Sequence, residues 1–395
     1  MAGIGAIDGA VLMQNDNKQN LFQWRVLGRV LIKALVLFAI VNVLLALVYP
    51  MPALGRISAY NWLFSGRERF PFGEDPAAAY NFSLFSFEAM FASHRVAAGG
   101  KAADEYRVIV LGDSSTWGTL LKPEETLAGQ LDSAGLKTTD GRKLRFYNLG
   151  YPTLSLFKDL MVIERAMVYQ PDLVLWLVTL DSFPVEKQLV SPIVANNAWE
   201  AQMLIDKYDL KLGGSENELE IPDFWQRTLF GQRRALADLA RLQLYGVMWE
   251  ATGIDQVYPI DYPPAQRDLG DDEFFYDRQP PTLTSDSLAL DVISAGLQTA
   301  GDVPVLLVNE PILISAGKNS DVRYNFYYPR WAYDQYRQLL ANEADVNGWQ
   351  YIDEWDLVPE MEFTNSAIHR TPTGETMLAA AVIEALNSSV DIAEQ

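Results

Sequence analysis

The chain has 395 residues and a formal net charge of −20, so it can bury a large core and is too acidic to be expected on nucleic acid. It contains no cysteine, which excludes disulfides, thiol catalysis and cysteine-ligated metals. The only histidines are His94 and His369, which makes a histidine-rich metal site implausible. We therefore expect a protein that carries neither a metal nor another cofactor.

An apolar, uncharged run near the N-terminus predicts one transmembrane helix. The run covers residues 34–49, and extended back to Val30 it has about 20 residues, enough to span a bilayer if Lys33 reaches back to the headgroups. Basic residues before it favour a cytoplasmic N-terminus. A long polar lead and the lack of a small-residue cleavage site argue against a cleaved signal peptide. We predict a cytoplasmic segment at 1–29, a bilayer-spanning helix at 30–50 and an extracytoplasmic main domain.

Beyond the helix, residues 51–105 mix aromatics with Gly, Pro and Arg and predict a stalk that leads into the domain. From residue 106 onward, strands and helices alternate. Apolar runs predict strands at 106–111, 144–149, 173–178, 303–308 and 349–352, and helical periodicity predicts helices at 124–133, 156–169, 330–344 and 373–386. Strands joined by crossover helices predict an α/β fold of three layers, α/β/α, with a five-stranded parallel doubly wound sheet.

Residues 183–302 interrupt that alternation and predict an insertion into a domain at 106–390. Asp223–Ala251 has the pattern of an amphipathic helix pair, and Pro259–Pro281 has the composition of a loop. An insertion between two core strands most often caps the active-site end of the sheet. A docking surface is the alternative.

Gly112-Asp113-Ser114 follows directly on the first predicted strand. This places Ser114 at the carboxyl end of a parallel strand, where α/β sheets hold their chemistry and where backbone N–H groups favour a developing negative charge. A serine hydroxyl needs a neighbouring base, and His369 is the candidate. We expect His369 Nε2 within hydrogen-bond reach of Ser114 Oγ, about 2.6–3.2 Å. The alternatives are a helix-capping serine and a packing histidine; His94 is expected to be structural or on the surface.

Four sequence blocks stand in order along the domain. They are Leu111–Gly118, Asn148–Thr153, Thr179–Asp181 and Ser366–Gly374. This arrangement resembles the SGNH/GDSL hydrolase superfamily, with its flavodoxin-like fold, over about residues 106–388 with the insertion set aside. The resemblance implies that Ser114 is the nucleophile and His369 its general base. The first and last blocks are specific, and the middle two are degenerate.

The last block departs from the family pattern at the residue that orients the histidine. The family usually has Asp three residues before its His, whereas this chain has Ser366 there, with Asn365 beside it. Asparagine can hold a tautomer but does not stabilise an imidazolium as a carboxylate does. Asp353 and Asp356, just after the last strand, are substitute carboxylates. A Ser–His dyad without a third member also remains open.

The two middle blocks depart at the oxyanion hole, the set of donors that stabilises the negative oxygen of the intermediate. The family usually offers an Asn side chain where this chain has Leu180, preceded by Thr179. The family's glycine falls near Thr153, with Gly150 earlier in the turn. The hole could be rebuilt from these groups and the Ser114 N–H, or it could be incomplete.

A third group of residues is a candidate for binding substrate. Asn309 and Glu310 end the fourth predicted strand, so they should open onto the same crevice as Ser114. Tyr324 and Asn325 belong to an aromatic stretch at 323–331 that suits stacking and hydrogen bonding to sugars. The alternative is an aromatic core beneath the insertion.

These observations predict a membrane-tethered, extracytoplasmic serine ester hydrolase or O-acyltransferase. The resemblance implies acyl esters, including those of envelope glycans, as substrates and a multispanning membrane acyltransferase as a partner. The alternative is a catalytically degenerate binding or assembly component of an envelope complex. The missing Asn and Asp favour that alternative, while Ser114 and His369 count against it.

Overall fold

The computed structural model describes residues 5–73, 83–212, 219, 221–256, 261–390 and 392–393, with side chains from residue 23 onward except Ser388 and Ser389. The chain divides into two compact units. The first comprises Met1–Met51 and Pro222–Ala237, and the second comprises Pro52–Ile221 and Asp238–Gln395.

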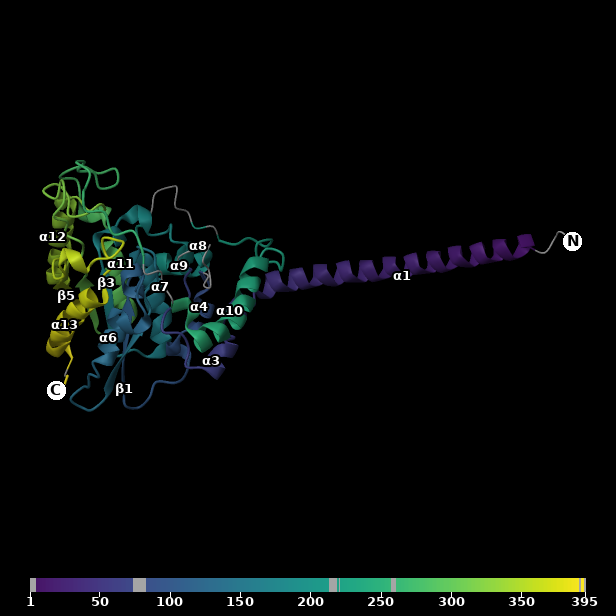
Figure 1. The fold of residues 1–395 in the computed structure, drawn as a ribbon, viewed down its shortest axis with the longest axis horizontal. Helices are drawn as coiled ribbons and strands as arrows, with labels where there is room; N and C mark the ends of the chain where they lie inside the picture. The colour runs from purple at the N-terminus through teal and green to yellow at the C-terminus, as the bar shows by residue number, and fades with distance from the viewer. Residues whose placement is uncertain are drawn as a thin grey trace. The chain divides into compact units, whose positions relative to one another are not determined.

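The first unit is built on one long helix, α1 (Gly5–Val48), drawn in purple in Figure 1. Its part Gln23–Val48 has a mean hydropathy of 2.7 and is long enough to cross a membrane. Leu37 and its apolar neighbours are exposed, so this is not the buried core helix of a soluble protein. A membrane anchor and a signal sequence both fit these properties. The helix contains almost all of the predicted span 30–50 and starts well before it.

The second unit contains a five-stranded, all-parallel sheet in the order β2-β1-β3-β4-β5 (Figure 1). The strands are β1 (Glu105–Leu111), β2 (Lys143–Asn148), β3 (Leu173–Val178), β4 (Val305–Asn309) and β5 (Gln350–Asp353). Every residue of β1, β3 and β4 is buried, because helices cover both faces of these central strands. The edge strand β2 instead alternates between exposed and buried residues. The predicted three-layer α/β fold with a five-stranded parallel sheet is confirmed.

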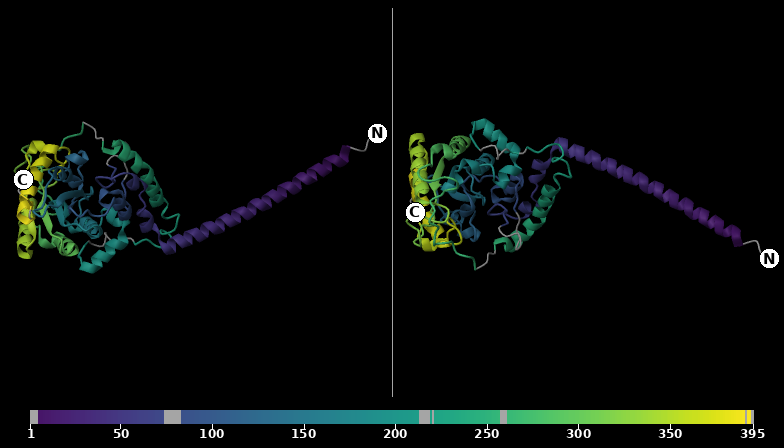
Figure 2. Two further views of the ribbon diagram at one scale, coloured as in Figure 1. Left: turned by 90° about the horizontal axis from the view of Figure 1, so that it is seen from below. Right: turned by 90° about the horizontal axis from the view of Figure 1, so that it is seen from above.

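Two helical layers enclose the sheet, as Figure 2 shows from opposite sides. On one face, α6 (Leu127–Ser133) and α13 (Pro372–Ser389) share a hydrophobic cluster with the strands. The other face carries α7 (Leu156–Ala166), α11 (Leu290–Ala300) and α12 (Arg330–Asn347). The remaining α-helices are α2 (Met51–Gly55), α3 (Ala59–Leu63), α4 (Phe87–Ser93), α5 (Ser114–Trp117), α8 (Pro192–Asn196), α9 (Ala198–Tyr208) and α10 (Arg233–Thr252).

The described part of residues 51–105 is not a stalk. Tyr60 and Phe70 are fully buried within the second unit. Arg69 donates hydrogen bonds to the carbonyls of Trp117 and Gly118, at 3.1 and 2.7 Å, and so supports the turn that carries Ser114. The apolar and aromatic residues of this segment bury against the domain, which overrides its loop-like composition. Residues 74–82 lie outside the described residues.

The predicted insertion is shorter than 183–302, because α11 is the crossover helix between β3 and β4. It packs on α7, and Gly296 approaches the sheet so closely that a Cβ there would lie 2.4 Å from the Trp176 ring. The helix pair expected in Asp223–Ala251 is a single helix, α10. Just before α10, the side chains of Asp223 and Thr228 accept hydrogen bonds from the backbone N–H groups of Gln226 and Gly231. Such side-chain bonds compete with the backbone bonds of a helix.

Only part of the insertion lies at the active-site end of the sheet. Tyr276 donates a hydrogen bond to Asp181, which follows β3. In contrast, α10 packs on the segment after α1, where a Cβ on Gly246 would lie 2.3 Å from the Tyr60 ring. The described residues 261–281 form neither helix nor strand, as predicted for this loop. The cap prediction therefore fits the stretch around Tyr276 and not α10.

Candidate active site

Ser114 begins the short helix α5 in the turn that follows β1. Gly112 has φ +152°, and a Cβ there would lie 2.2 Å from Thr116 Oγ1, so the turn requires glycine. The Asp113 side chain caps the helix by accepting a hydrogen bond from the Ser115 N–H at 2.8 Å. The sequence Gly-Asp-Ser therefore places a partly exposed hydroxyl at the carboxyl edge of the sheet.

His369 connects Ser114 to Asn365. Its Nε2 lies 2.8 Å from Ser114 Oγ, within the range expected from the sequence, and its Nδ1 lies 2.8 Å from Asn365 Oδ1. The amide oxygen only accepts, so this contact assigns the imidazole proton to Nδ1. Nε2 is then free to accept the proton of the serine hydroxyl. A nucleophile that is hydrogen-bonded to a base, with a third group orienting that base, is the geometry of an activated nucleophile.

The electrostatic surroundings keep His369 neutral. Burial, followed by the positive charge of Arg370, lowers the pKa of His369 to about 4. The imidazole is therefore a proton acceptor at neutral pH. Among the residues that the structure describes, no adjacent carboxylate stabilises the imidazolium that forms when His369 takes the proton.

The predicted substitute carboxylates do not reach the histidine. Asp353 accepts hydrogen bonds from Asn309 Nδ2 at 2.7 Å and from Arg337 Nε at 2.9 Å, which uses both of its oxygens. Asp356 is exposed. These two predictions are wrong, because Asn365 occupies the position beside Nδ1. Ser366 is buried next to Asn365, and no described contact joins its hydroxyl to the imidazole.

Three of the four expected oxyanion donors, those of Gly150, Thr153 and Thr179, are already bonded within the protein. The Gly150 N–H donates to Asn148 Oδ1 at 3.1 Å, and the Thr153 N–H donates to a backbone carbonyl at 2.6 Å. The Thr179 hydroxyl lies 3.0 Å from the hydroxyl of Tyr328, and both residues are fully buried. Leu180, at the family's Asn position, is also buried.

Among the described residues, no group accepts a hydrogen bond from the Ser114 N–H, the first amide of α5. This leaves one free donor beside the nucleophile. Removing one oxyanion donor from an enzyme costs roughly 10²–10³ in rate, or about 3–4 kcal/mol. The base side of the site is therefore complete, while its oxyanion side is sparse.

The four predicted substrate-binding residues lie in the interior. They are Asn309, Glu310, Tyr324 and Asn325. Asn309 Oδ1 accepts from the Tyr336 hydroxyl at 3.0 Å, and Tyr324 donates to Asp334 at 2.8 Å. Asn325 Oδ1 accepts backbone N–H groups of its own turn. Burial places these four out of reach of a substrate, and the structure supports the alternative of an aromatic core.

Two residues that the sequence analysis did not single out join Asp181 at the edge of the sheet. Lys187 Nζ lies 2.5 Å from the Asp181 carboxylate, and the Tyr276 hydroxyl donates to the other oxygen. Tyr276 remains half exposed. Tyr276 lies 95 residues from Asp181 along the chain, so this contact could be found only in the folded structure.

The other histidine is structural, as expected. His94 is fully buried, its Nδ1 accepts the Val96 N–H at 3.1 Å, and its Nε2 lies 3.0 Å from the Glu68 carbonyl. Burial lowers the pKa of His94 to about 3. Within the described part of the chain, no group of three or more His, Cys, Asp or Glu side chains could hold a metal.

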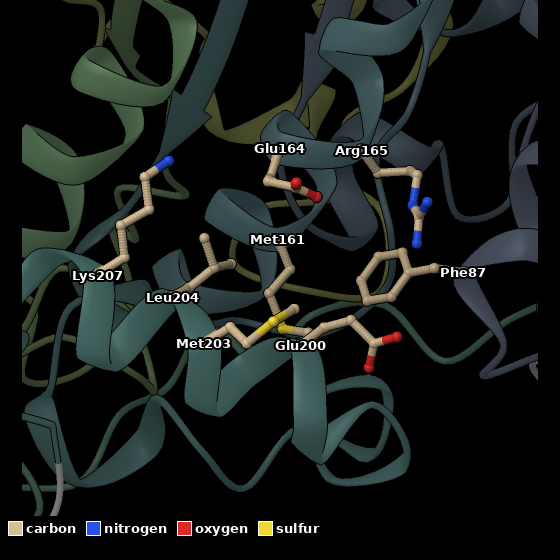
Figure 3. Close-up of a pocket in the computed structure, with 8 residues that line it drawn as sticks. All are labelled: Phe87, Met161, Glu164, Arg165, Glu200, Met203, Leu204 and Lys207. Carbon is tan, nitrogen blue, oxygen red and sulfur yellow. The ribbon is translucent and has the colours of Figure 1, made fainter. Parts of the chain in front are cut away.

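A cavity of about 230 Å³ lies away from these residues, between α4, α7 and α9 (Figure 3). It is lined by Phe87, Met161, Glu164, Arg165, Glu200, Met203, Leu204 and Lys207. None of the predicted site residues belongs to this lining.

No protein-family model and no curated protein matches this chain by sequence. Among solved structures, a lipolytic G-D-S-L family protein from Veillonella parvula is similar with 10% identity over 71% of this chain and 98% of its own, at a TM-score of 0.34. An acetylxylan esterase from Geobacillus stearothermophilus shows 12% identity over 73% and 95%, at 0.35. A carbohydrate acetylesterase from Sinorhizobium meliloti shows 14% identity over 72% and 100%, at 0.33. These scores are low, so the functional conclusion rests on Ser114 and His369.

Proposed function

We propose that the second unit is a serine ester hydrolase or O-acyltransferase with Ser114 as its nucleophile. The observation that carries the proposal is the hydrogen-bonded chain from Ser114 Oγ through His369 to Asn365. A neutral imidazole with Nε2 facing the hydroxyl is the arrangement that makes serine reactive.

The geometry supports a two-step reaction. Ser114 Oγ attacks the acyl carbon while its proton passes to His369 Nε2. The resulting oxyanion accepts a hydrogen bond from the Ser114 N–H. Collapse of this intermediate breaks the ester bond, and the imidazolium returns its proton to the leaving alcohol. Water, or a sugar hydroxyl, then loses its proton to Nε2 and attacks the acyl-enzyme. As the acyl–oxygen bond to Ser114 breaks, Nε2 returns this proton to Ser114 Oγ. Water as acceptor gives hydrolysis, and a hydroxyl acceptor gives acyl transfer.

We also propose that α1 anchors the protein in a membrane, with the second unit outside. The length and hydropathy of Gln23–Val48 and the exposure of its apolar side chains support this placement. An outward-facing domain would meet acyl esters of envelope glycans, the substrates that the family resemblance implies. A multispanning membrane acyltransferase remains the proposed partner.

One observation favours a second candidate function, a binding or assembly component that has lost catalysis. The groups expected at the oxyanion hole, Gly150, Thr153 and Thr179, are engaged by neighbours in the structure. A protein of this kind would keep the sheet and its surface while turning over no ester.

Covalent labelling separates the two candidates. The full-length protein in detergent is treated with a fluorophosphonate probe, which reacts with activated serines. We expect labelling of the wild type and none of Ser114→Ala, with Ser133→Ala, at an exposed serine of α6, as a control that retains the nucleophile. A folded wild type that takes no label would favour the binding component.

Protease accessibility tests the topology. In intact spheroplasts, added protease should digest the second unit and leave a short protected N-terminal fragment. Complete protection would place the domain in the cytoplasm and remove envelope glycans as substrates.

A further inference from the structure

The segment Pro222–Ala237, here called the juxtamembrane segment, belongs to the same compact unit as α1. The Phe230 N–H donates to Asn42 Oδ1 at 3.2 Å, and the Arg227 guanidinium lies 6.0 Å from the centre of the Tyr49 ring. Asn42 lies six residues before Val48, or about 9 Å along the helix. The segment therefore lies beside the last turns of the apolar helix.

Three aromatic and two basic side chains are exposed in this segment: Phe224, Trp225, Phe230, Arg233 and Arg234. Trp225 is 74% exposed and Phe230 is 65% exposed, although both are large and apolar. The segment contains three arginines and one aspartate in a chain whose net charge is −20. Arg233 places its guanidinium 4.5 Å from the Phe230 ring. Aromatic rings and arginines are the residues typical of the bilayer interface.

Many backbone groups of the segment are hydrogen-bonded within the segment, to its side chains or to its own backbone. The Gln226 N–H donates to Asp223 Oδ1 at 2.8 Å. The Thr228 hydroxyl donates to the Trp225 carbonyl at 2.6 Å and accepts the Gly231 N–H at 3.2 Å. Backbone groups that are already bonded lose less free energy when they leave water, which lets an irregular segment enter the interface.

We propose that the juxtamembrane segment lies in the outer headgroup region of the bilayer, as a second membrane contact beside α1. Its aromatic side chains insert toward the acyl chains, and its arginines contact lipid phosphates. Interfacial segments bury about 5–10 Å into this region, which matches the position of Phe230 beside Asn42. The proposal rests on the membrane anchoring proposed above and does not depend on catalysis.

Because the chain has no cysteine, single cysteines can be spin-labelled cleanly. Trp225→Cys and Phe230→Cys are labelled in the full-length protein, in vesicles of equal parts phosphatidylcholine and phosphatidylglycerol. Trp199→Cys, on exposed α9 of the second unit, is the water-facing control, and Leu37→Cys is the bilayer control. Collisions with oxygen and with a water-soluble nickel complex then report depth.

Labels at 225 and 230 should meet the nickel complex at least roughly threefold less often than the label at 199, and oxygen more often. Nickel accessibility equal to that at 199 would overturn the proposal. Low accessibility to both reagents would also overturn it, since it would indicate a protein contact, such as a second copy. A water-facing label at 37 would instead refute the anchoring itself.

A second inference comes from a different observation, the buried carboxylate of Glu310. The Ser115 hydroxyl donates to Glu310 Oε2, and the same oxygen accepts from Arg370 Nη1 at 2.9 Å. Arg370 also donates from Nε to Glu375 at 3.1 Å. All four side chains are buried. Glu310 thus joins the residue that follows the nucleophile to the residue that follows the base.

We infer that Glu310 is a positioning residue: it fixes the position of the turn that carries Ser114 relative to the turn that carries His369. This inference deepens the proposed function. Around Arg370 the charged groups are Glu310, Glu375 and Asp113. Glu375 contacts Arg370 and not Ser115, so it provides a matched control for the charge of Glu310 without its link to the nucleophile turn.

The two histidines make a direct measurement possible. In protein with ¹⁵N-labelled histidine, the Nε2 shift of His369 reports its bond to Ser114 Oγ, whether or not the protein turns over an ester. Glu310→Gln and Ser115→Ala should move this shift toward its value in Ser114→Ala, and Glu375→Gln should not. For an active enzyme, the first two variants should also lower kcat about tenfold with KM little changed.

A wild-type Nε2 shift in Ser115→Ala would overturn the inference, and that variant keeps the test valid if Glu310→Gln fails to fold. Equal shifts in Glu310→Gln and Glu375→Gln would also overturn it, because charge alone would then explain the effect. Failure of the proposed function would appear separately, as absent probe labelling with an unchanged NMR result.

Discussion

The two sides of the candidate site differ in how far they retain catalytic geometry. On the base side, Ser114, His369 and Asn365 form an unbroken chain of hydrogen bonds. On the oxyanion side, the N–H of Thr153 and the hydroxyl of Thr179 bond to neighbouring protein groups. The nucleophile can therefore be activated while the charge that develops on the substrate meets few donors.

In the proposed site, the two sides would respond differently to substitution. The Asn365 amide oxygen stands where the resemblance leads one to expect a carboxylate, and an acceptor placed at Nδ1 holds the tautomer. An oxyanion donor has no such freedom, since it must point at one position in space. We expect slow turnover with a reactive serine, and the following experiments test that imbalance.

The largest effect should come from the nucleophile. Ser114→Ala should lower kcat/KM on short acyl esters by at least roughly 10³-fold, because the covalent step is lost. Its free energy of unfolding should change by less than about 0.5 kcal/mol, since the side chain is partly exposed. Ester turnover and urea unfolding measure the two quantities. Wild-type turnover in this variant would mean that another residue is the nucleophile.

Removing the orienting amide should have the next largest effect. Asn365→Ala should lower kcat about 10²-fold, because the imidazole loses the acceptor that sets its tautomer and rotation. Ser366→Ala is the matched control, as it alters the neighbouring side chain without touching the imidazole, and should stay within about threefold of wild type. Equal losses in both variants would indicate local misfolding instead of lost orientation.

The pH dependence of kcat/KM should show an unusually low acid limb. The pKa of His369 is lowered to about 4, so the imidazole stays neutral and able to accept a proton well below pH 6.5. The rate at pH 5 should remain about nine-tenths of its value at pH 7, provided that the protein stays folded. An acid limb near pH 6.5 would contradict this.

A carboxylate at position 365 should move that limb. In Asn365→Asp, the negative charge beside Nδ1 favours the imidazolium and raises the pKa of His369, so the acid limb shifts to higher pH. The same charge should support proton transfer and raise the plateau rate. A profile identical to that of the wild type would show that position 365 does not face the base during catalysis.

The smallest effect is expected on the oxyanion side. Tyr328→Phe frees the Thr179 hydroxyl from its partner, but the hydroxyl is buried and should not reach the substrate. We expect kcat/KM to change by less than about threefold, with a loss of about 1 kcal/mol in stability. A rate increase of tenfold or more would show that Tyr328 withholds a usable donor.

Local patterns in the sequence predicted most of the fold. The strand at 173–178 was placed correctly, because a fully apolar run of that length marks a strand buried on both faces. The stalk at 51–105 was misassigned, because its aromatics bury against a domain distant in sequence. The predicted end of the insertion, at residue 302, is too late, because α11 already belongs to the core. Its role as a crossover helix can be recognised only from its packing on α7.

The sheet, the long apolar helix and the candidate pair of Ser114 and His369 could be predicted from local features, namely apolar strand runs, helix length and a serine at a strand end. Folding was needed to show that Asn365 faces Nδ1, that Thr179 bonds to Tyr328 and that Glu310 is buried against Ser115 and Arg370. Each of these outcomes is a choice among hydrogen-bond partners, most of them far apart along the chain. That choice depends on which side chains share a buried volume, and a buried polar group bonds to whatever packing places beside it.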